Sequence, residues 1–404
     1  MAERKYYTAP DVAERAIRGC WPELNFRLGE QIGHGGMSDV YKLAAGGRVE
    51  ALKVTNSAAR ADTPELYEED LCWRGAKELE YARRMSEAGC GVKVYDTAEV
   101  ALSDSDSNRR LFLIRMEYLQ SLPKYLEQLQ EAERTATVLA ALESVAKTIQ
   151  KMEKEKTLHR DIKPENILVK NCGASPEFFL TDFGLARPNY LESKMDNFSI
   201  SGTGCYRSPE LLEGREIVGN KSDIYSLGVS LYKLLVHKGK KRLQFDPLIF
   251  AHQVDQYKDV PDDILEVILA LTKNDPQERL SPQKAATALH RALLVHDKER
   301  YAAALENALY ALRGRCANAN ELVNSLPRGA ALQHKDAKTA RQLLAGSDHP
   351  ACWFYLAGVI PEQAQSLLER AARAGYAPAR AALLGLPRNP QKQLAALRAA
   401  LQQL

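Results

Sequence analysis

Three glycines and a lysine near the N-terminus have the types and spacing of a phosphate-binding site. Gly33, Gly35 and Gly36 lie between two strand-forming segments, and a turn without Cβ atoms lets backbone N–H groups approach phosphate oxygens closely. Lys53 follows in the apolar segment 51–54, where a buried ammonium group would need an anionic partner. Each signal alone has an ordinary alternative, a common hairpin tip or a surface lysine. Together they favour a pocket for phosphates.

Two later segments carry residues that would complete such a site. Residues 159–166 read His-Arg-Asp-Ile-Lys-Pro-Glu-Asn, and residues 181–184 read Thr-Asp-Phe-Gly. With the glycine segment and Lys53 before them, they reproduce in order the signature set of protein kinases. The chain from residue 26 to residue 296, roughly two thirds of its length, therefore resembles the eukaryotic-type (Hanks-type) Ser/Thr protein kinase family.

The resemblance implies a role for each polar residue of these segments. Phosphoryl transfer requires an acceptor hydroxyl in line with the γ-phosphorus and neutralisation of the phosphate charge. Asp161 would orient the hydroxyl and take its proton, and Lys163 would reach toward the γ-phosphate. Asn166 and Asp182 would supply the oxygen ligands that Mg²⁺, or Mn²⁺, prefers. Lys53 would hold the α- and β-phosphates of ATP.

A carboxylate from the helix after Lys53 must orient that lysine. We expect Glu78, because the family's helices carry apolar residues four and seven positions after this glutamate, and Ala82 and Met85 occupy these positions here. For every glutamate of the helix but one, a solvated helix face is the expected environment. The alternatives to Glu78 are Glu68, Glu69 and Glu80.

The resemblance also places apolar side chains around the adenine of ATP. Val40 and Ala51 would cover one side of the ring and Leu168 the other, while Met116 would lie at the back of the pocket. These positions could equally be plain core, because a nucleotide pocket is partly core. The residues expected to bind ATP are Ile32, Gly33, Gly35, Gly36, Val40, Ala51, Lys53, Met116, Glu117, Leu119 and Leu168.

Two backbone groups and one unusual side chain complete the expected nucleotide site. The carbonyl of Glu117 and the amide of Leu119 would bond to the adenine edge. Ser38 stands where the family has its third loop glycine, so it adds a Cβ where the backbone bends over the phosphates and a hydroxyl that could bond to them. We therefore expect an altered ATP affinity with activity retained.

The segment after Asp182 predicts the class of acceptor. Residues 202–210 read Gly-Thr-Gly-Cys-Tyr-Arg-Ser-Pro-Glu, similar to the family's Gly-Thr-x-x-Tyr-x-(Ala/Ser)-Pro-Glu. Thr203 matches the threonine that bonds to the catalytic aspartate and lysine of Ser/Thr kinases, and small-molecule kinases lack this segment. The resemblance therefore implies transfer of the γ-phosphate to Ser or Thr of proteins. The alternative is a pseudokinase scaffold that acts through its helical tail.

Other residues are expected to regulate or brace the site. In the family, an arginine placed like Arg160 can bind a phosphate on the activation segment through two hydrogen bonds. Of the candidates for autophosphorylation, Ser199 and Ser201 are favoured over Thr203, which already has a role. Glu210 and Arg279 would form a buried charge pair, and Asp223 would hold the backbone of residues 159–166. Ser193 is a further candidate phosphosite.

The elements that must position these residues divide the chain. Apolar patterns predict a hairpin and a third strand over 26–54, one or two helices over 64–85, a buried strand over 111–118, and helices over 135–154, 223–235 and 261–272. The resemblance implies an α+β, bilobal fold with a small β-rich N-lobe, one main helix in it, and a larger helical C-lobe. We expect an N-terminal extension over 1–25, a kinase domain over 26–297 and an all-α module over 298–404.

The tail differs in composition from the rest. Residues 301–404 hold 26 alanines, with 12 basic against six acidic side chains, which favours helices. Pro361 and Gly375 bracket one predicted helix. The region is similar to Sel1-like repeats, which are related to tetratricopeptide repeats, and would then recruit a protein partner or substrate. The alternative, which the sequence favours equally, is a helical extension that packs on the kinase domain.

Composition excludes several other classes. The 404 residues carry a formal net charge of +3, which gives no basis for nucleic-acid binding. We find neither a secretory signal nor an apolar stretch as long as a membrane span. The seven cysteines are scattered, without the close pairs of a zinc knuckle or a small disulfide framework. These features predict a cytoplasmic protein.

Overall fold

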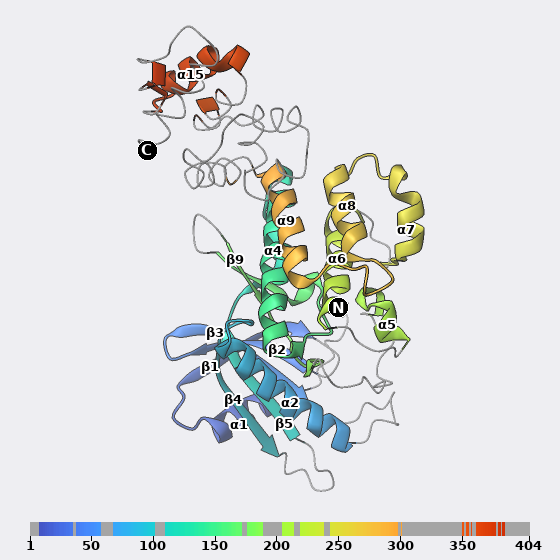
Figure 1. Cartoon of the computed structure of the whole chain (residues 1–404). Coiled ribbons are helices and arrows are strands. Elements are labelled where there is room, and N and C mark those ends of the chain that lie inside the picture. Colours follow the sequence, from blue (N-terminus) through green and yellow to red (C-terminus); the bar gives the residue numbers. More distant parts are fainter. Residues whose placement is uncertain are drawn as a thin grey trace, which may run out of the picture. The chain divides into compact units, whose positions relative to one another are not determined.

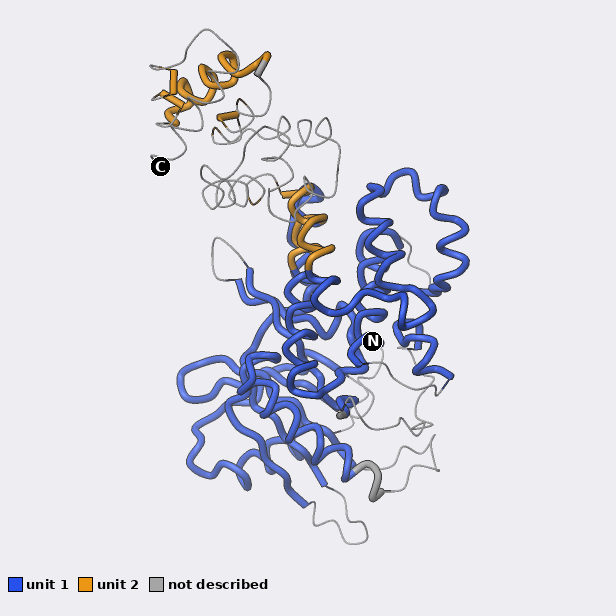
Figure 2. Tube along the Cα trace, viewed as in Figure 1, with its two compact units in different colours: residues 1–134, 141–286 blue, residues 135–140, 287–404 orange. Residues whose placement is uncertain are grey.

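A computed structural model gives the architecture of the chain (Figure 1). The chain divides into two compact units, residues 1–134 with 141–286 and residues 135–140 with 287–404 (Figure 2). The structure describes residues 8–34, 38–57, 68–101, 110–171, 176–188, 204–213, 219–237, 243–297, 300, 350, 353–354, 357, 361–376, 379–380 and 382–383.

Five antiparallel strands form the sheet that carries Lys53. Their order is β1-β2-β3-β5-β4. Side chains along β3 alternate between the two faces, so that Leu52 and Val54 point one way and Ala51 and Lys53 the other. The strands are β1 (Phe26–His34), β2 (Ser38–Ala45), β3 (Arg48–Asn56), β4 (Val94–Ala101) and β5 (Arg110–Glu117).

A helix from the N-terminal extension shares the core of this sheet. Helix α1 (Pro10–Cys20) begins with a proline in its first turn, where the missing N–H costs nothing. It buries Ile17 and two alanines against apolar side chains of β2, β3 and β5. The segment before the helix is bonded to β2, because the Thr8 amide donates to Asp39 over 2.7 Å and the Tyr41 hydroxyl donates to the Thr8 carbonyl. The extension thus packs on the sheet and is hydrogen-bonded to it.

Helix α2 (Glu68–Glu87) packs against the sheet at β4 and β5. Its approach is close at Gly75, where an added Cβ would lie 2.1 Å from a ring carbon of Phe112. The Phe112 side chain is itself buried. Only a residue without a side chain therefore lets α2 lie this near to β5, and Glu78 follows Gly75 by about one turn of the helix.

The remaining elements of the first unit are mostly helical (Figure 1). Helix α6 is almost wholly buried from Ser222 to Tyr232, and it approaches α8 so closely that a Cβ on Gly228 would meet Leu271 and Thr272. Two small sheets, β6-β8-β9 and β7-β10, lie in the same unit. The helices are α3 (Leu122–Leu126), α4 (Glu131–Lys154), α5 (Pro209–Leu212), α6 (Lys221–Leu235), α7 (Pro247–Gln253), α8 (Asp262–Leu271) and α9 (Pro282–His296), where residues 135–140 of α4 and residues 287–296 of α9 belong to the second unit. The short strands and turns are β6 (Gln120–Ser121), β7 (Thr157–Leu158), η1 (Pro164–Asn166), β8 (Ile167–Lys170), β9 (Glu177–Leu180), β10 (Arg187–Pro188), η2 (Gly204–Tyr206) and η3 (Val254–Gln256).

The described part of the tail is helical. Turn η4 (Pro361–Gln363) leads into α15 (Ala364–Arg373). Gly375 follows with a φ of +90°, and the amides of Gly375 and Tyr376 bond to the Ala372 and Ala371 carbonyls, both over 3.1 Å. This pattern is the Schellman motif, which ends a helix on a glycine. The predicted end of this helix at Gly375 is thereby confirmed, whereas the α-helix begins at Ala364, after the turn η4.

The α+β fold class is confirmed, with a β-rich lobe followed by a helical one. The predicted strands and the helices at 135–154, 223–235 and 261–272 all occur, within a few residues of their expected ends. Of the predicted helical region 64–85, the described part is the single helix α2. None of the helices in the described ranges combines the length and the apolar character that a membrane crossing needs.

Replacing Gly75 with alanine should lower the free energy of unfolding by about 1–3 kcal/mol, because the new Cβ overpacks the contact with Phe112. The matched control is Gly19→Ala in α1, where nothing lies within 4 Å of the added Cβ. Alanine there should leave stability unchanged or raise it by up to about 1 kcal/mol. Urea unfolding followed by circular dichroism measures both. Equal stabilities of the two variants would contradict the close approach of α2.

Candidate active site

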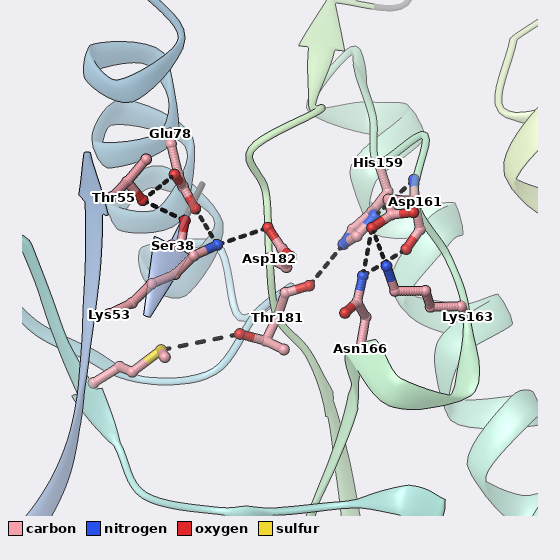
Figure 3. Close-up of polar contacts among 11 residues, drawn as sticks. Ser38, Lys53, Thr55, Glu78, His159, Asp161, Lys163, Asn166, Thr181 and Asp182 are labelled. Atoms are coloured by element: carbon pink, nitrogen blue, oxygen red, sulfur yellow. Dashed lines mark hydrogen bonds and ion pairs between the residues drawn. The ribbon is translucent and has the colours of Figure 1, made fainter. Parts of the chain in front are cut away.

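Lys53 lies between two carboxylates that come from opposite sides of the site (Figure 3). Its ammonium group forms an ion pair with Glu78 of α2 and lies 2.8 Å from Oδ1 of Asp182, in the loop after β9. The Lys53 and Glu78 side chains are only 10% and 6% exposed, whereas Asp182 is 39% exposed. One buried cation therefore joins a strand, a helix and a loop 129 residues further along the chain.

The charges of this group reinforce one another. Burial alone would lower the pKa of Lys53, but the carboxylates of Asp182 and Glu78 outweigh it and hold the pKa above its usual value. Burial would raise the pKa of Asp182, yet the Lys53 ammonium outweighs that effect and the pKa lies below its ordinary value. Lys53 therefore stays charged and Asp182 ionised at neutral pH.

A second group gathers around Asp161. The Lys163 ammonium donates to Oδ2 of Asp161 over 2.8 Å. The side-chain amide of Asn166 donates to the same oxygen over 2.9 Å and to the Asp161 carbonyl over 2.8 Å. All three residues lie in the loop between β7 and β8, and turn η1 brings Asn166 back toward Asp161. A carboxylate fixed in this way can orient a hydroxyl and accept its proton.

Asp223, at the start of α6, holds this loop by its backbone. Its two carboxylate oxygens accept the amides of His159 and Arg160, each over 2.9 Å. Burial raises the pKa of Asp223 even though these hydrogen bonds act in the opposite direction. The loop needs such support because Arg160 has a φ of +66°, which side chains rarely adopt.

The two groups are connected through the residues next to Asp182. His159 Nε2 lies 3.1 Å from the Thr181 carbonyl, and the His159 ring packs against Phe183 with centroids 4.9 Å apart. Asp182 itself has a φ of +67°. Figure 3 shows Asp182 between the Lys53 group and the Asp161 group. The two sets of charged side chains thus face one site.

An apolar cluster collects the residues predicted to surround adenine. Ala51 and Met116 are buried in it, and the partly buried members pack against them. Residues 118–119 connect β5 to β6, and so link the larger sheet to the sheet that contains Leu168. The predicted members found in this cluster are Ile32, Val40, Ala51, Met116, Leu119 and Leu168.

A buried ion pair joins two segments of the helical lobe that lie 69 residues apart in the sequence. Arg279 donates from Nη1 and Nη2 to the two carboxylate oxygens of Glu210, over 2.7 and 3.1 Å. Neither side chain is more than 1% exposed. The same guanidinium donates to the carbonyls of Lys221 and Lys273, so its remaining protons also find acceptors, as a buried charge requires.

Some predicted residues lie outside the described ranges, and others have an unexpected environment. The Glu117 side chain pairs with Lys170 over 2.9 Å, and Gly33 is the penultimate residue of β1. Sequence reasoning overlooked Thr55, whose hydroxyl contacts Glu78; its position two residues after Lys53 was the available signal. The predicted site residues outside the described ranges are Gly35, Gly36, Ser193, Ser199, Ser201 and Thr203.

The donor set fits a hard divalent cation held together with phosphates. Asn166 offers an amide oxygen and Asp182 a partly exposed carboxylate, the ligands that Mg²⁺ prefers. Within the described ranges, no group of three or more His, Cys, Asp or Glu side chains could hold a metal alone. A magnesium ion bound by one or two side chains and completed by a nucleotide's phosphates agrees with both observations.

Comparison with known proteins adds independent evidence. The sequence model of the protein kinase domain matches residues 26–294. The chain is 30% identical over 249 residues to a probable serine/threonine-protein kinase pknA2 of Bifidobacterium longum, covering 59% of this chain and 30% of that protein. It is 30% identical over 290 residues to the serine/threonine-protein kinase PknB of Mycolicibacterium smegmatis, covering 67% and 43%. It is 31% identical over 189 residues to PknD of Chlamydia caviae, covering 42% and 20%.

The chain therefore spans less than half the length of each of these relatives. The match to the family model, in contrast, covers well over half of the chain and includes both groups of charged residues. On that match, and on the arrangement of Lys53, Asp161, Asn166 and Asp182, the chain belongs to the protein kinase family.

Proposed function

We propose that this protein is a Ser/Thr protein kinase that transfers the γ-phosphate of ATP to hydroxyls of protein substrates. The contact of Lys53 with both Glu78 and Asp182 carries the proposal. It places a permanent cation beside a carboxylate suited to a metal, as binding of a nucleotide polyphosphate requires. The names of the similar proteins favour Ser and Thr as acceptors.

Each side chain then has a task in the transfer. Asp161, held by Lys163 and Asn166, orients the acceptor hydroxyl and takes its proton as the new P–O bond forms and ADP departs. Lys53 binds the α- and β-phosphates. Asn166 and Asp182 would hold Mg²⁺ or Mn²⁺, which supplies positive charge that neutralises the phosphates. The apolar cluster around Met116 would enclose adenine.

Asp161→Asn should lower kcat by about 10²–10⁴-fold, because the amide cannot accept the proton of the acceptor hydroxyl. Transfer of labelled phosphate from ATP to a generic basic protein, with Mg²⁺ or Mn²⁺, measures this. Asp255→Asn is the matched control, since Asp255 lies exposed in η3, and it should act like the wild type. A wild-type protein that transfers no phosphate with either metal would contradict the proposal and favour a scaffold role.

The kinase also activates itself, in this proposal, by phosphorylating the segment between residues 185 and 203. Arg160 supports the idea, because it directly precedes Asp161 in the loop that Asp223 braces, and a phosphate can bind a guanidinium through two hydrogen bonds. Ser199 and Ser201 are the proposed acceptors.

Mass spectrometry should find phosphate between residues 185 and 203 of the wild type and none there in Asp161→Asn. Replacing Ser199 and Ser201 together with alanine should lower transfer to a generic substrate, since the arginine would lose its phosphate ligand. Equal phosphorylation of wild type and Asp161→Asn would show that another kinase does the work. An active wild type without phosphate in this segment would contradict the idea.

The tail recruits protein substrates, in this proposal, through helices of the Sel1-like or tetratricopeptide-like kind. Its described part supports a helical packing unit, because α15 buries Leu367 and Leu368 and the Arg370 guanidinium lies 3.9 Å from the centre of the Trp353 ring. Repeats of this type usually present one face to a partner. All the catalytic residues named above precede the tail.

Removal of residues 298–404 should leave transfer to a generic protein within about twofold, while phosphorylation of physiological substrates in cells should fall. Quantitative phosphoproteomics of cells with the full or the shortened chain measures the second effect, and Asp161→Asn supplies the background. A shortened protein that is insoluble, or inactive toward the generic substrate, would show that the tail belongs to the kinase fold. Identical phosphoproteomes would also contradict recruitment.

A further inference from the structure

Two hydroxyl side chains form a buried chain of hydrogen bonds that ends on Glu78 (Figure 3). Ser38 Oγ lies 2.8 Å from Thr55 Oγ1, and Thr55 Oγ1 lies 3.0 Å from Glu78 Oε2. The three residues are between 4% and 8% exposed. Ser38 and Thr55 face each other directly across β2 and β3, where a pair of hydroxyl side chains stabilises a sheet.

The direction of these bonds follows from the donors available. An ionised carboxylate only accepts, and each hydroxyl carries one proton. Thr55 must therefore spend its proton on Glu78, and the Thr55 oxygen accepts from Ser38. The hydrogen bonds thus all donate in one direction, from Ser38 at the start of β2 to Glu78 in helix α2.

This arrangement uses both oxygens of Glu78. Oε1 forms the ion pair with Lys53 and Oε2 accepts from Thr55. Lys53 and Thr55 lie two residues apart on β3, so their side chains emerge on the same face of the sheet. A long glutamate side chain held at both oxygens loses its freedom to rotate away, and the carboxylate stays turned toward Lys53.

The first hydroxyl of this hydrogen-bond chain, that of Ser38, lies next to the predicted phosphate loop in the sequence. Ser38 is the first residue of β2 and follows the glycines of that loop. In the sequence pattern, glycine would stand here, and glycine has no hydroxyl to donate. The structure directs the Ser38 hydroxyl to Thr55, although the sequence had suggested a phosphate as its partner. The residue therefore ties the end of the phosphate loop to the carboxylate that orients Lys53.

We propose that Ser38 and Thr55 are positioning residues that hold Glu78 in place for Lys53 and couple the phosphate loop to α2. The proposal rests on the phosphoryl transfer proposed above. Ser38 acts through Thr55, so that the loss of either hydroxyl has the same consequence. Neither residue needs to touch the reacting atoms.

Thr55→Val removes the hydroxyl and keeps the shape. It should lower kcat/KM for ATP about ten- to a hundredfold, as the loss of a hydrogen bond to a charged group does. Thr55→Ser restores the donor and should recover most of this loss, which a purely structural role of the Thr55 methyl would not allow. Thr97→Val in β4 is the matched control, because the Thr97 hydroxyl accepts a hydrogen bond from the exposed side chain of Arg83. This variant should act like the wild type.

A double-mutant cycle tests whether Ser38 acts on Glu78 through Thr55. Ser38→Ala should lower kcat/KM for ATP by a few-fold, and the double variant Ser38→Ala with Thr55→Val should be no worse than Thr55→Val alone. Additive effects would instead show that Ser38 acts directly on the phosphates, and would overturn the coupling. All assays are run well below the midpoints of thermal unfolding, so that loss of folded protein does not contribute.

The outcomes separate this proposal from the one it rests on. If the wild type transfers phosphate and Thr55→Val is equally active, the positioning role is wrong and the kinase activity stands. If Thr55→Val and Thr55→Ser lose the same activity, the hydroxyl is irrelevant and the proposal is again wrong. A wild type without transfer overturns both.

Discussion

A buried ammonium group needs carboxylates within reach, and this requirement at Lys53 organises the first unit of the protein. Its two partners come from a helix that packs on the sheet and from a loop of the helical lobe. The ammonium can be buried only if α2 and the loop around Asp182 are both in place. The close approach at Gly75 and the rare backbone conformation of Asp182 are features that this placement depends on.

The helical lobe uses the same principle for support. Arg279 and Glu210 form a buried pair whose remaining protons reach backbone carbonyls, and Asp223 accepts two amides of the loop that carries Asp161. In both cases a charged side chain forms hydrogen bonds with backbone groups and so fixes the position of a loop. The carboxylate of Asp161 therefore has a fixed position even though its loop contains no long helix or strand.

The local motifs could predict that Asp161, Lys163 and Asn166 lie together, because these residues belong to one turn-forming loop. The element types could be predicted for the same reason, since apolar periodicity is a local property. The partner of Lys53 could not be settled locally. Four glutamates of one helical region were open, and only the packing of α2 on the sheet decides which carboxylate reaches β3.

The remaining gaps have the same cause. The bond between Ser38 and Thr55 depends on the register of two strands, which no short motif encodes. The helix α1 has an amphipathic pattern, but nothing in its sequence says which surface it covers. Its docking depends on tertiary contacts, among them those of Ile17 in the core of the sheet.

Because α1 docks on the sheet, the segment that is homologous to other proteins and the segment that folds as one unit have different boundaries. The segment that is homologous to other kinases begins at residue 26, whereas the segment that folds together with the sheet begins at or before Thr8. A recombinant fragment cut at the homologous boundary would lack the backbone groups bonded to Asp39 and Tyr41 and would expose an apolar sheet face to water. Such a face favours aggregation. Sequence similarity here marks the shared ancestry of the kinase, and the cooperative folding unit is larger.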